Sequence, residues 1–543
     1  MRFVLAFASL IATGVAVTGV VATPAVAQPT AESAPAAGAR GDPLEGFDAY
    51  VERARRDWHV PGLAIGVVRN DSVVFLKGYG VRTLGTADSV GVHTLFANAS
   101  TTKAFTAAVA ATLVDQGRLR WDDRVVDRVA GFALRDPWVT RELTVRDLLS
   151  HQLGFGDPQY LWYLHPTDSL PQLLPRLRLV PAQSSFRARF AYNNVGYALA
   201  GAVDAAAGGE SWDALVRHRL LEPLGMRDTR TRGREVAGLA DVARPHDLVR
   251  DTLRPLPEWT RRLVDGVPAA GAMYSSVADM TRWIRFLLDS ARIPADAAGG
   301  RRRLISDTAF AALFTPQTLV PPGEFYLTAR LTEPAFTAYG FGWFLQDYAG
   351  ERVAYHTGSI DGTVALVGLV PARRLGVVIF ANRDHAELRH ALLWRVVDAH
   401  RGGGGGAPRD WSAELRALYT RADTARRAVG RRADSLRVRD VRASLPLARY
   451  VSAYADSLYG TMRVRMDSAG RGGPAGGLVL EVAPGVVADL QPLGGDAFRA
   501  VWRTGWMTPD VVRFRVGADG RAVELSVGED GGSPVYARVA DAR

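Results

Sequence analysis

The sequence predicts an α/β domain whose mixed, mainly antiparallel sheet is flanked by helices and carries an inserted helical lobe, followed by a small all-β, barrel-like domain. Three observations lead to this prediction. A helix and a hairpin come first, a helical region follows, and strand patterns return before a closing helix. A Gly-rich break then precedes a tail of short alternating segments.

The first elements are predicted from apolar spacing and from turn residues. Apolar side chains recur at helical intervals before Pro61, and Asn70-Asp71 separates two strand-like runs. The predicted elements are an amphipathic helix that begins near Leu44 and ends near Pro61-Gly62, a hairpin of Leu63–Val68 and Ser72–Gly78, and an Ala-rich helix over Thr102–Gln116 that stops at Gly117.

The middle of the chain, about Trp121–Thr281, alternates short helical patterns with Pro and Gly breaks. Strand patterns return after it, so the sheet is expected to combine both ends of this region, with the helices as a second lobe. The later predicted elements are strands at Phe341–Gln346, Arg352–Tyr355, Val364–Leu369 and Gly376–Ala381, and a helix over His385–Ala399.

The boundaries expected from composition give a main domain over residues 44–400, a Gly-rich linker over 401–410, and a tail over 411–543. The tail opens with an Arg-rich helix, Trp411–Arg437. Alternating segments such as Met462–Met466 then predict a small antiparallel sheet or barrel. No cluster of residues in the tail suggests chemistry.

The first 27 residues have the pattern of a secretory signal peptide. An apolar run from Phe3 to Ala22 is followed by an A-x-A-like cleavage site ending at Ala27, and residues 28–43 read as a tether. We therefore expect a periplasmic or secreted protein, with no stable membrane insertion after cleavage. An uncleaved anchor is the alternative, because the run approaches the roughly 20 residues that span a bilayer.

Composition excludes several function classes. The net charge of +10 is spread along the chain without a dense basic block among aromatics, which argues against nucleic acid binding. Cysteine is absent, so disulfides, thiolate metal sites and lipoprotein acylation are excluded. The scattered Asp and His residues show no metal-ligand spacing, and we expect neither a metal nor a cofactor.

The only lysines in this Arg-rich chain are Lys77 and Lys103. A buried lysine can lose its proton, whereas arginine cannot, so the chemistry at position 103 could require an amine. Ser100 lies three positions earlier, on the same face of the predicted helix. A neutral Lys103 could activate the Ser100 hydroxyl. The alternative is a helix cap beside a solvated lysine, and the Ser-x-x-Lys motif alone is weak.

Two further motifs follow in order. They are Tyr192-Asn193-Asn194 in the helical region and His356-Thr357-Gly358-Ser359 on a late strand. With Ser-x-x-Lys, they resemble the active-site motifs of the penicillin-recognising serine hydrolases, which include class C β-lactamases, D-alanyl-D-alanine carboxypeptidases, esterases and D-aminopeptidases. The segments Leu143–Phe155 and Ala270–Ser276 also resemble family segments, with Leu153 at a usual serine position. The resemblance covers about Leu44–Ala399.

The resemblance implies a role for each motif residue. Ser100 would be acylated, and Lys103 and Tyr192 would share the proton transfers, with the acylation base left open between them. The remaining implied roles are Asn194 as holder of Lys103 and of the substrate amide, the backbone N–H groups of Ser100 and Ser359 as oxyanion hole, and His356, Thr357 and Gly358 as substrate-binding residues.

One departure from the family pattern concerns the substrate. His356 stands where the β-lactamases have lysine, and histidine is mostly neutral above a pKa of about 6.5. This favours esterase, peptidase or amidase activity over antibiotic hydrolysis. His151 is interpreted as a structural histidine. The region Pro446–Ala542 resembles the lipocalin-like barrel appended to some of these hydrolases, which implies a role in shaping the cleft or in assembly.

We therefore expect an exported, cofactor-free serine hydrolase that acts through an acyl-enzyme on small esters, amides or D-amino-acid peptides. A class C-like β-lactamase is the nearest alternative, and a non-catalytic sensor or scaffold of the same fold is another. Partners are a small-molecule or short peptide substrate, and an oligomer is possible. Specificity is expected to lie in the loops Asp157–Ser185 and Arg301–Pro334.

Overall fold

The computed structural model describes most of the chain from residue 42 onward. The predicted signal peptide 1–27, nearly all of the tether 28–43, and the linker residues 403–407 lie outside the described residues. Among the described helices, none combines the length and the hydropathy needed to cross a membrane. The described residues are 42–163, 168–249, 252–294, 300–402, 408–435, 442–467, 477–504, 507, 510–528 and 534–539.

An eight-stranded sheet forms the centre of the larger domain, in the order β2-β1-β14-β13-β12-β11-β10-β9, with every neighbouring pair antiparallel. The N-terminal hairpin pairs with the last strand, which confirms that the sheet combines both ends of the region. The strands are β1 (Gly62–Arg69), β2 (Ser72–Gly80), β9 (Thr318–Leu319), β10 (Thr337–Tyr339), β11 (Phe344–Tyr348), β12 (Glu351–Ile360), β13 (Thr363–Val370) and β14 (Leu375–Ala381).

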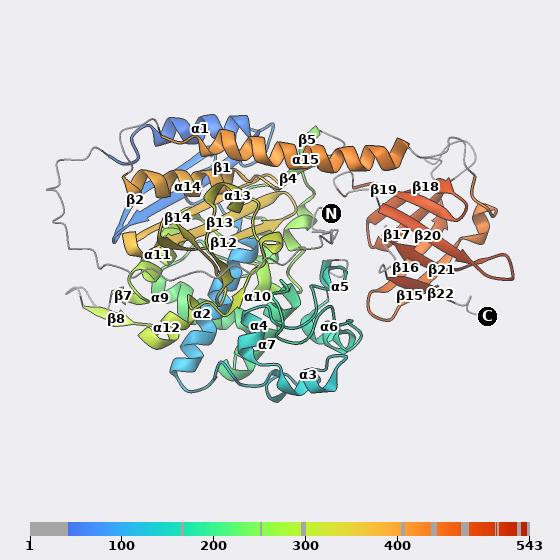
Figure 1. Cartoon of the computed structure of the whole chain (residues 1–543), viewed down its shortest axis with the longest axis horizontal. Coiled ribbons are helices and arrows are strands. Elements are labelled where there is room, and N and C mark those ends of the chain that lie inside the picture. Colours follow the sequence, from blue (N-terminus) through green and yellow to red (C-terminus); the bar gives the residue numbers. More distant parts are fainter. Residues whose placement is uncertain are drawn as a thin grey trace, which may run out of the picture.

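Helices cover both faces of this sheet (Figure 1). Alternate residues of β14 enter different cores, with Val378 in one and Ile379 in the other. A Cβ on Gly376 would lie 2.3 Å from Ile284 of α11 (Val277–Leu288), and one on Gly368 would lie 2.7 Å from Leu393 of α14 (Leu388–Arg401). Burial on two sides explains why the central strands are continuous apolar runs.

The helical lobe lies on the α11 side of the sheet, around α2 (Thr102–Asp115), which is buried from Thr102 to Leu113. Small alanine side chains allow neighbouring helices to approach it closely. The remaining elements of this domain are α1 (Phe47–Asp57), α3 (Pro137–Glu142), α4 (Val145–Leu149), α5 (Gln159–Tyr163), α6 (Leu170–Leu177), α7 (Asn194–Gly208), α8 (Trp212–Val216), α9 (Glu222–Leu224), α10 (Pro268–Gly271), α12 (Asp307–Leu313), α13 (Ala329–Thr332), and the short strands β3 (Phe96–Ala97), β4 (His246–Val249), β5 (Thr252–Pro255), β6 (Tyr274–Ser275), β7 (Arg292–Pro294) and β8 (Arg301–Arg303).

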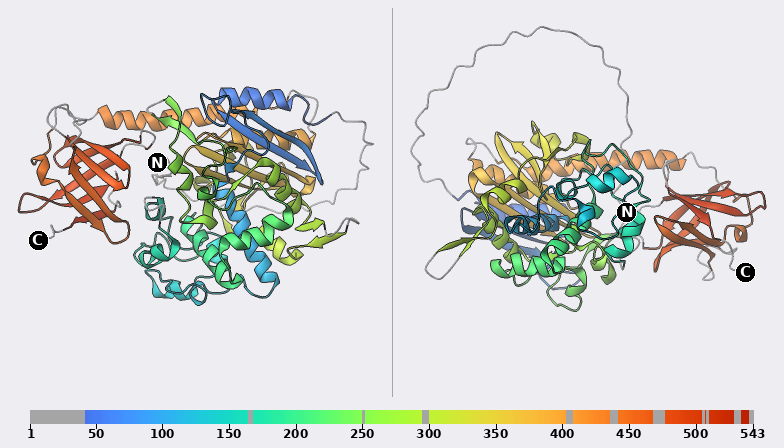
Figure 2. Two further views of the ribbon diagram at one scale, coloured as in Figure 1. Left: turned by 180° about the vertical axis from the view of Figure 1, so that it is seen from behind. Right: turned by 90° about the horizontal axis from the view of Figure 1, so that it is seen from below.

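A long helix, α15 (Trp411–Ser435), runs from the larger domain toward a separate C-terminal body (Figures 1 and 2). Its first turn is anchored, because the Trp411 indole N–H donates to Asp398 at 2.7 Å and the Ser412 amide to Tyr50 at 2.9 Å. The tail closes into an eight-stranded barrel, which resolves the expectation of a sheet or a barrel. Its strands are β15 (Ser452–Asp456), β16 (Gly460–Met466), β17 (Leu478–Ala483), β18 (Val486–Gly494), β19 (Ala497–Trp502), β20 (Asp510–Val516), β21 (Ala522–Val527) and β22 (Val535–Arg538).

Some predicted boundaries were wrong for local reasons. The strand expected over Phe341–Gln346 begins only at Phe344, because Gly342 has φ +81° and forms a turn after β10. The strand expected over Arg352–Tyr355 continues through the polar motif to Ile360. The closing helix begins at Leu388 rather than His385, whose φ of +46° is left-handed.

Candidate active site

Ser100 lies in a single 3-10 turn, Ala99–Thr101, which leads directly from β3 into α2. The preceding Ala99 has φ +45°, a conformation that alanine rarely adopts and that is commonly found at functional sites. The turn presses against β12, since a Cβ on Gly358 would lie 2.2 Å from the Asn98 carbonyl oxygen and 3.0 Å from the Ser100 nitrogen. Only glycine at 358 permits this approach.

Lys103 is fully buried one turn after Ser100. Its Nζ lies 3.0 Å from Ser100 Oγ, 2.8 Å from Asn194 Oδ1 and 2.8 Å from the Ala270 carbonyl oxygen. Burial lowers the pKa of Lys103 to about 7, although the charge of Asp157 acts in the opposite direction. A large fraction of this amine is therefore neutral near neutral pH.

The three contacts define where the lone pair of a neutral amine must point. A neutral lysine has two N–H groups, and both Asn194 Oδ1 and the Ala270 carbonyl can only accept hydrogen bonds. Those two acceptors consume both donors. The lone pair then faces Ser100 Oγ, which is within reach for proton transfer.

The Tyr192 ring closes the other side of the amine, with its centroid 4.8 Å from Lys103 Nζ. Burial raises the pKa of Tyr192 well above its usual value, opposed by a side-chain hydrogen bond with Ser100. The phenol is thus protonated at neutral pH, and it lies where it can pass a proton between Ser100, Lys103 and a substrate.

Asn194 begins α7, whose N-cap is Asn193. The Asn193 side chain accepts from the Gly196 amide at 2.9 Å, which fixes the turn and directs Asn194 toward Lys103. His151 supports the same turn, because its Nδ1 accepts the Asn193 N–H at 3.0 Å. The centroid of its ring lies 4.4 Å from that of the Tyr192 ring.

The late motif lies on β12, and its side chains alternate. His356 points to the Ser100 side and pairs through Nε2 with the Tyr339 hydroxyl at 2.9 Å, while its Nδ1 lies 2.6 Å from the Thr357 carbonyl oxygen. Burial lowers the pKa of His356 to about 3, so the ring is neutral. Thr357 donates through Oγ1 to the Tyr326 hydroxyl at 2.8 Å.

A small cavity opens over Ser100. Its walls combine apolar side chains with the polar residues Ser100, Asn194 and Ser359, and no lysine, arginine or histidine is among the lining residues. The residues that line it are Ala99, Ser100, Trp162, Asn194, Val264, Val267, Ala270, Gly271, Ser359 and Ile360.

The structure brings all the predicted site residues to one place, around α2, the start of α7 and the end of β12. Four neighbours were not predicted: Asp157, Trp162, Tyr326 and Arg389. Arg389 donates to the Ser359 hydroxyl at 2.9 Å and pairs with Glu387 at 3.2 Å. The first three fall in or beside the loops expected to hold specificity, but a lone polar residue in a loop carries no periodic signal.

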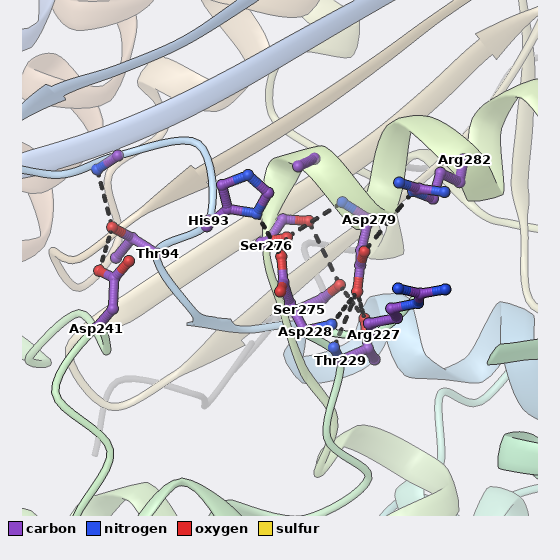
Figure 3. A network of polar contacts seen from close by, with 12 residues as sticks. His93, Thr94, Arg227, Asp228, Thr229, Asp241, Ser275, Ser276, Asp279 and Arg282 are labelled. Atoms are coloured by element: carbon purple, nitrogen blue, oxygen red, sulfur yellow. Dashed lines mark hydrogen bonds and ion pairs between the residues drawn. The ribbon is translucent and has the colours of Figure 1, made fainter. Parts of the chain in front are cut away.

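The segment Ala270–Ser276, which resembles a family segment, contributes to the site through its backbone. The carbonyl oxygen of Ala270 accepts a hydrogen bond from Lys103. Behind it lies the network of Figure 3, in which Asp279 accepts from the backbone N–H groups of Asp228 at 2.8 Å and Thr229 at 2.9 Å. Ser276 donates to Asp228 at 2.7 Å. Among the described residues, no group of three His, Cys, Asp or Glu side chains could hold a metal ion.

Comparisons with known proteins show the family to which this chain is similar. The family model described as "Beta-lactamase" matches residues 47–401. The unguisins hydrolase ungD of Aspergillus violaceofuscus is 29% identical over 79% of this chain and 77% of its own. Penicillin-binding protein 4 of Amycolatopsis lactamdurans is 31% identical over 62% of this chain and 84% of its own.

Solved structures match almost the whole chain, the barrel included. The octameric penicillin-binding protein homologue from Pyrococcus abyssi covers 91% of this chain and 99% of its own, with 19% identity and a TM-score of 0.57. The structure of SurE covers 92% and 99%, with 23% identity and a TM-score of 0.52. At these identities the likeness concerns the fold.

Proposed function

The chain belongs to the beta-lactamase family of hydrolases, and from this premise we propose that it is an exported serine hydrolase which forms an acyl-enzyme on Ser100. One observation carries the proposal. A fully buried Lys103, with its pKa lowered to about 7, lies 3.0 Å from the Ser100 hydroxyl. A scaffold without catalysis would have no use for a buried amine, because burying it costs stability.

Acylation follows from the positions of the donors and acceptors. Lys103 takes the Ser100 proton through its lone pair, and Oγ attacks the substrate carbonyl carbon. The backbone N–H groups of Ser100 and Ser359 would stabilise the oxyanion. When the intermediate collapses, the bond to the leaving group breaks, and the proton now on Lys103 passes to that group directly or through Tyr192.

Deacylation uses the same groups in reverse. A water molecule attacks the acyl carbon while Lys103 takes its proton, directly or by relay through Tyr192, and the bond to Oγ breaks. That proton returns to Ser100, so the cycle ends with the starting ionisation states. Asn194 keeps the amine in place during both steps and offers its amide to the substrate.

The substrates that suit this site are small neutral esters, amides or D-amino-acid peptides. The cavity walls carry no charged side chain, and His356 is neutral and bound to Tyr339, so it offers no cation to a substrate carboxylate. The buried cation near β12, Arg389, is paired with Glu387. Recognition of a β-lactam carboxylate would lack the charge that a lysine at 356 would supply.

The test is a Ser100→Ala variant assayed with p-nitrophenyl esters, D-amino-acid p-nitroanilides and nitrocefin. We expect turnover of an ester or anilide by the wild type and a loss of roughly 10³-fold or more in the variant, since the nucleophile is removed. Equal turnover by both proteins would refute the proposal. Rapid hydrolysis of nitrocefin alone would instead identify a β-lactamase, and no covalent labelling at all would identify a non-catalytic member.

A further inference from the structure

Asp157 lies in the chain between Gly156 and α5, and the side chain of Asn194 connects it to the proposed catalytic amine of Lys103. The Asp157 side chain is partly buried. It accepts hydrogen bonds from Asn194 Nδ2 at 2.8 Å, from the Asn194 backbone N–H at 3.1 Å and from the Trp162 indole N–H at 3.2 Å. A longer contact of 3.4 Å reaches the Val195 amide.

These contacts place a negative charge at the N-terminus of α7. The first backbone N–H groups of a helix have no partners within the helix, and the helix dipole favours an anion beside them. Asp157 satisfies the amides of Asn194 and Val195 and so completes the cap that Asn193 begins.

The same carboxylate determines which way the Asn194 amide faces. An ionised carboxylate only accepts hydrogen bonds, so Asn194 must turn Nδ2 toward Asp157 and Oδ1 toward Lys103. With Oδ1 as acceptor, the Lys103 lone pair is left for Ser100. Reversing the amide would place N–H groups against the amine and remove this arrangement.

Charge is the second effect of Asp157 on the amine. Its electrostatic attraction raises the pKa of Lys103, against the larger lowering by burial. Burial also raises the pKa of Asp157 itself, and the hydrogen bonds from Asn194 and Trp162 and the charge of Lys103 oppose this rise. The other titratable groups that face this pair are Tyr192, Tyr197, His151, His356 and, from the β15–β16 turn of the barrel, Tyr459.

We propose that Asp157 is a positioning residue that orients Asn194 and Trp162 and sets the pH at which Lys103 becomes able to activate Ser100. Trp162 is included because it lines the cavity and its indole N–H donates a hydrogen bond to the Asp157 carboxylate. The inference rests on the proposed function of Ser100.

The test compares Asp157→Asn with Asp157→Glu by labelling Ser100 with a fluorophosphonate across pH 5 to 9. Asn removes the charge, so the midpoint of the pH profile should move to lower pH by roughly one unit, and the maximal rate should fall about tenfold because Asn194 is no longer oriented. Glu keeps the charge, so its midpoint should stay within a few tenths of the wild-type value even if its rate falls.

Two controls separate charge from packing. Trp162→Phe removes one donor to Asp157 without changing any charge, and we expect an unchanged midpoint. Asp136→Asn alters an exposed carboxylate that caps α3 through the Trp138 amide, and it should leave both rate and midpoint unchanged.

An unshifted midpoint in Asp157→Asn, or equal shifts in the Asn and Glu variants, would overturn the inference and leave the proposed function intact. A wild type that is not labelled on Ser100 at any pH would overturn both. Melting curves of each variant show whether a lower labelling rate reflects unfolding. The pH midpoint is a ratio of rates within one variant, so it is taken at temperatures below the melting transition of that variant.

Discussion

The interior of the barrel and the interior of the larger domain differ in the kinds of side chain that they bury. Among the described barrel residues, those that are buried are apolar or aromatic, such as Tyr454, Phe498 and Phe514. The larger domain instead buries charged and titratable groups, including Lys103 and His356. Burying such groups destabilises a fold unless they are paired, so we expect the function to reside in the larger domain, which holds them.

The two lysines express this contrast most directly. Lys77 is half exposed and pairs with Asp48 at 2.7 Å on the surface, whereas Lys103 is buried among neutral acceptors. Lys77→Arg should therefore leave activity unchanged. Lys103→Arg should reduce labelling and turnover by roughly 10³-fold, because a guanidinium cannot serve as a base.

Ester turnover and Ser100 labelling of the two variants, compared side by side, measure this difference. Lys103→Met is the companion variant, since it removes the amine without burying a permanent charge. Retained activity in Lys103→Met would show that Tyr192 alone is the base. It would contradict the proposal that Lys103 takes the proton of Ser100.

A smaller effect is expected on stability in acid. All ten histidines of the chain precede residue 401, and the barrel has none. Burial lowers the pKa values of His356 and His390 to about 3 in the folded state. The unfolded chain, with histidine pKa values near 6.5, then binds more protons between pH 6.5 and 3, so stability is complete above pH 6.5 and falls as the pH drops.

Differential scanning calorimetry from pH 7 to pH 4 tests this expectation. The transition of the larger domain should lose on the order of 2–3 kcal/mol for each buried histidine, whereas the barrel transition should lose less. His390→Leu should flatten the loss, and His93→Ala, at an exposed position, should not. A barrel that loses stability as steeply as the larger domain would contradict the contrast.

Much of the fold was predictable from the pattern of apolar residues. Burial on both faces of the sheet produces the continuous apolar runs of β1, β13 and β14. Burial on one face produces the alternation of apolar and polar residues in the barrel strands. The strand β12 (Glu351–Ile360) was predicted too short, because Thr357 to Ser359 near its end are polar or lack a side chain. They are held in the sheet by pairing with β13 rather than by apolar burial.

The site was predictable to the extent that its residues fall in motifs. Ser100, Lys103, Tyr192 and Asn194 do converge, but the sequence did not indicate that Asp157 lies beneath them. The partner of His356 was also missed, since Tyr339 reaches it only through the pairing of β10 and β11. Such contacts depend on tertiary geometry rather than on local spacing.

The central claim is that a neutral Lys103 activates Ser100. The most direct measurement is the rate of fluorophosphonate labelling as a function of pH, with the modified peptide located by mass spectrometry. We expect a single adduct on Ser100 and a rate that rises with pH to a plateau, with its midpoint near the Lys103 pKa of about 7. An adduct on another residue, or a rate that does not change between pH 5 and 9, would contradict it.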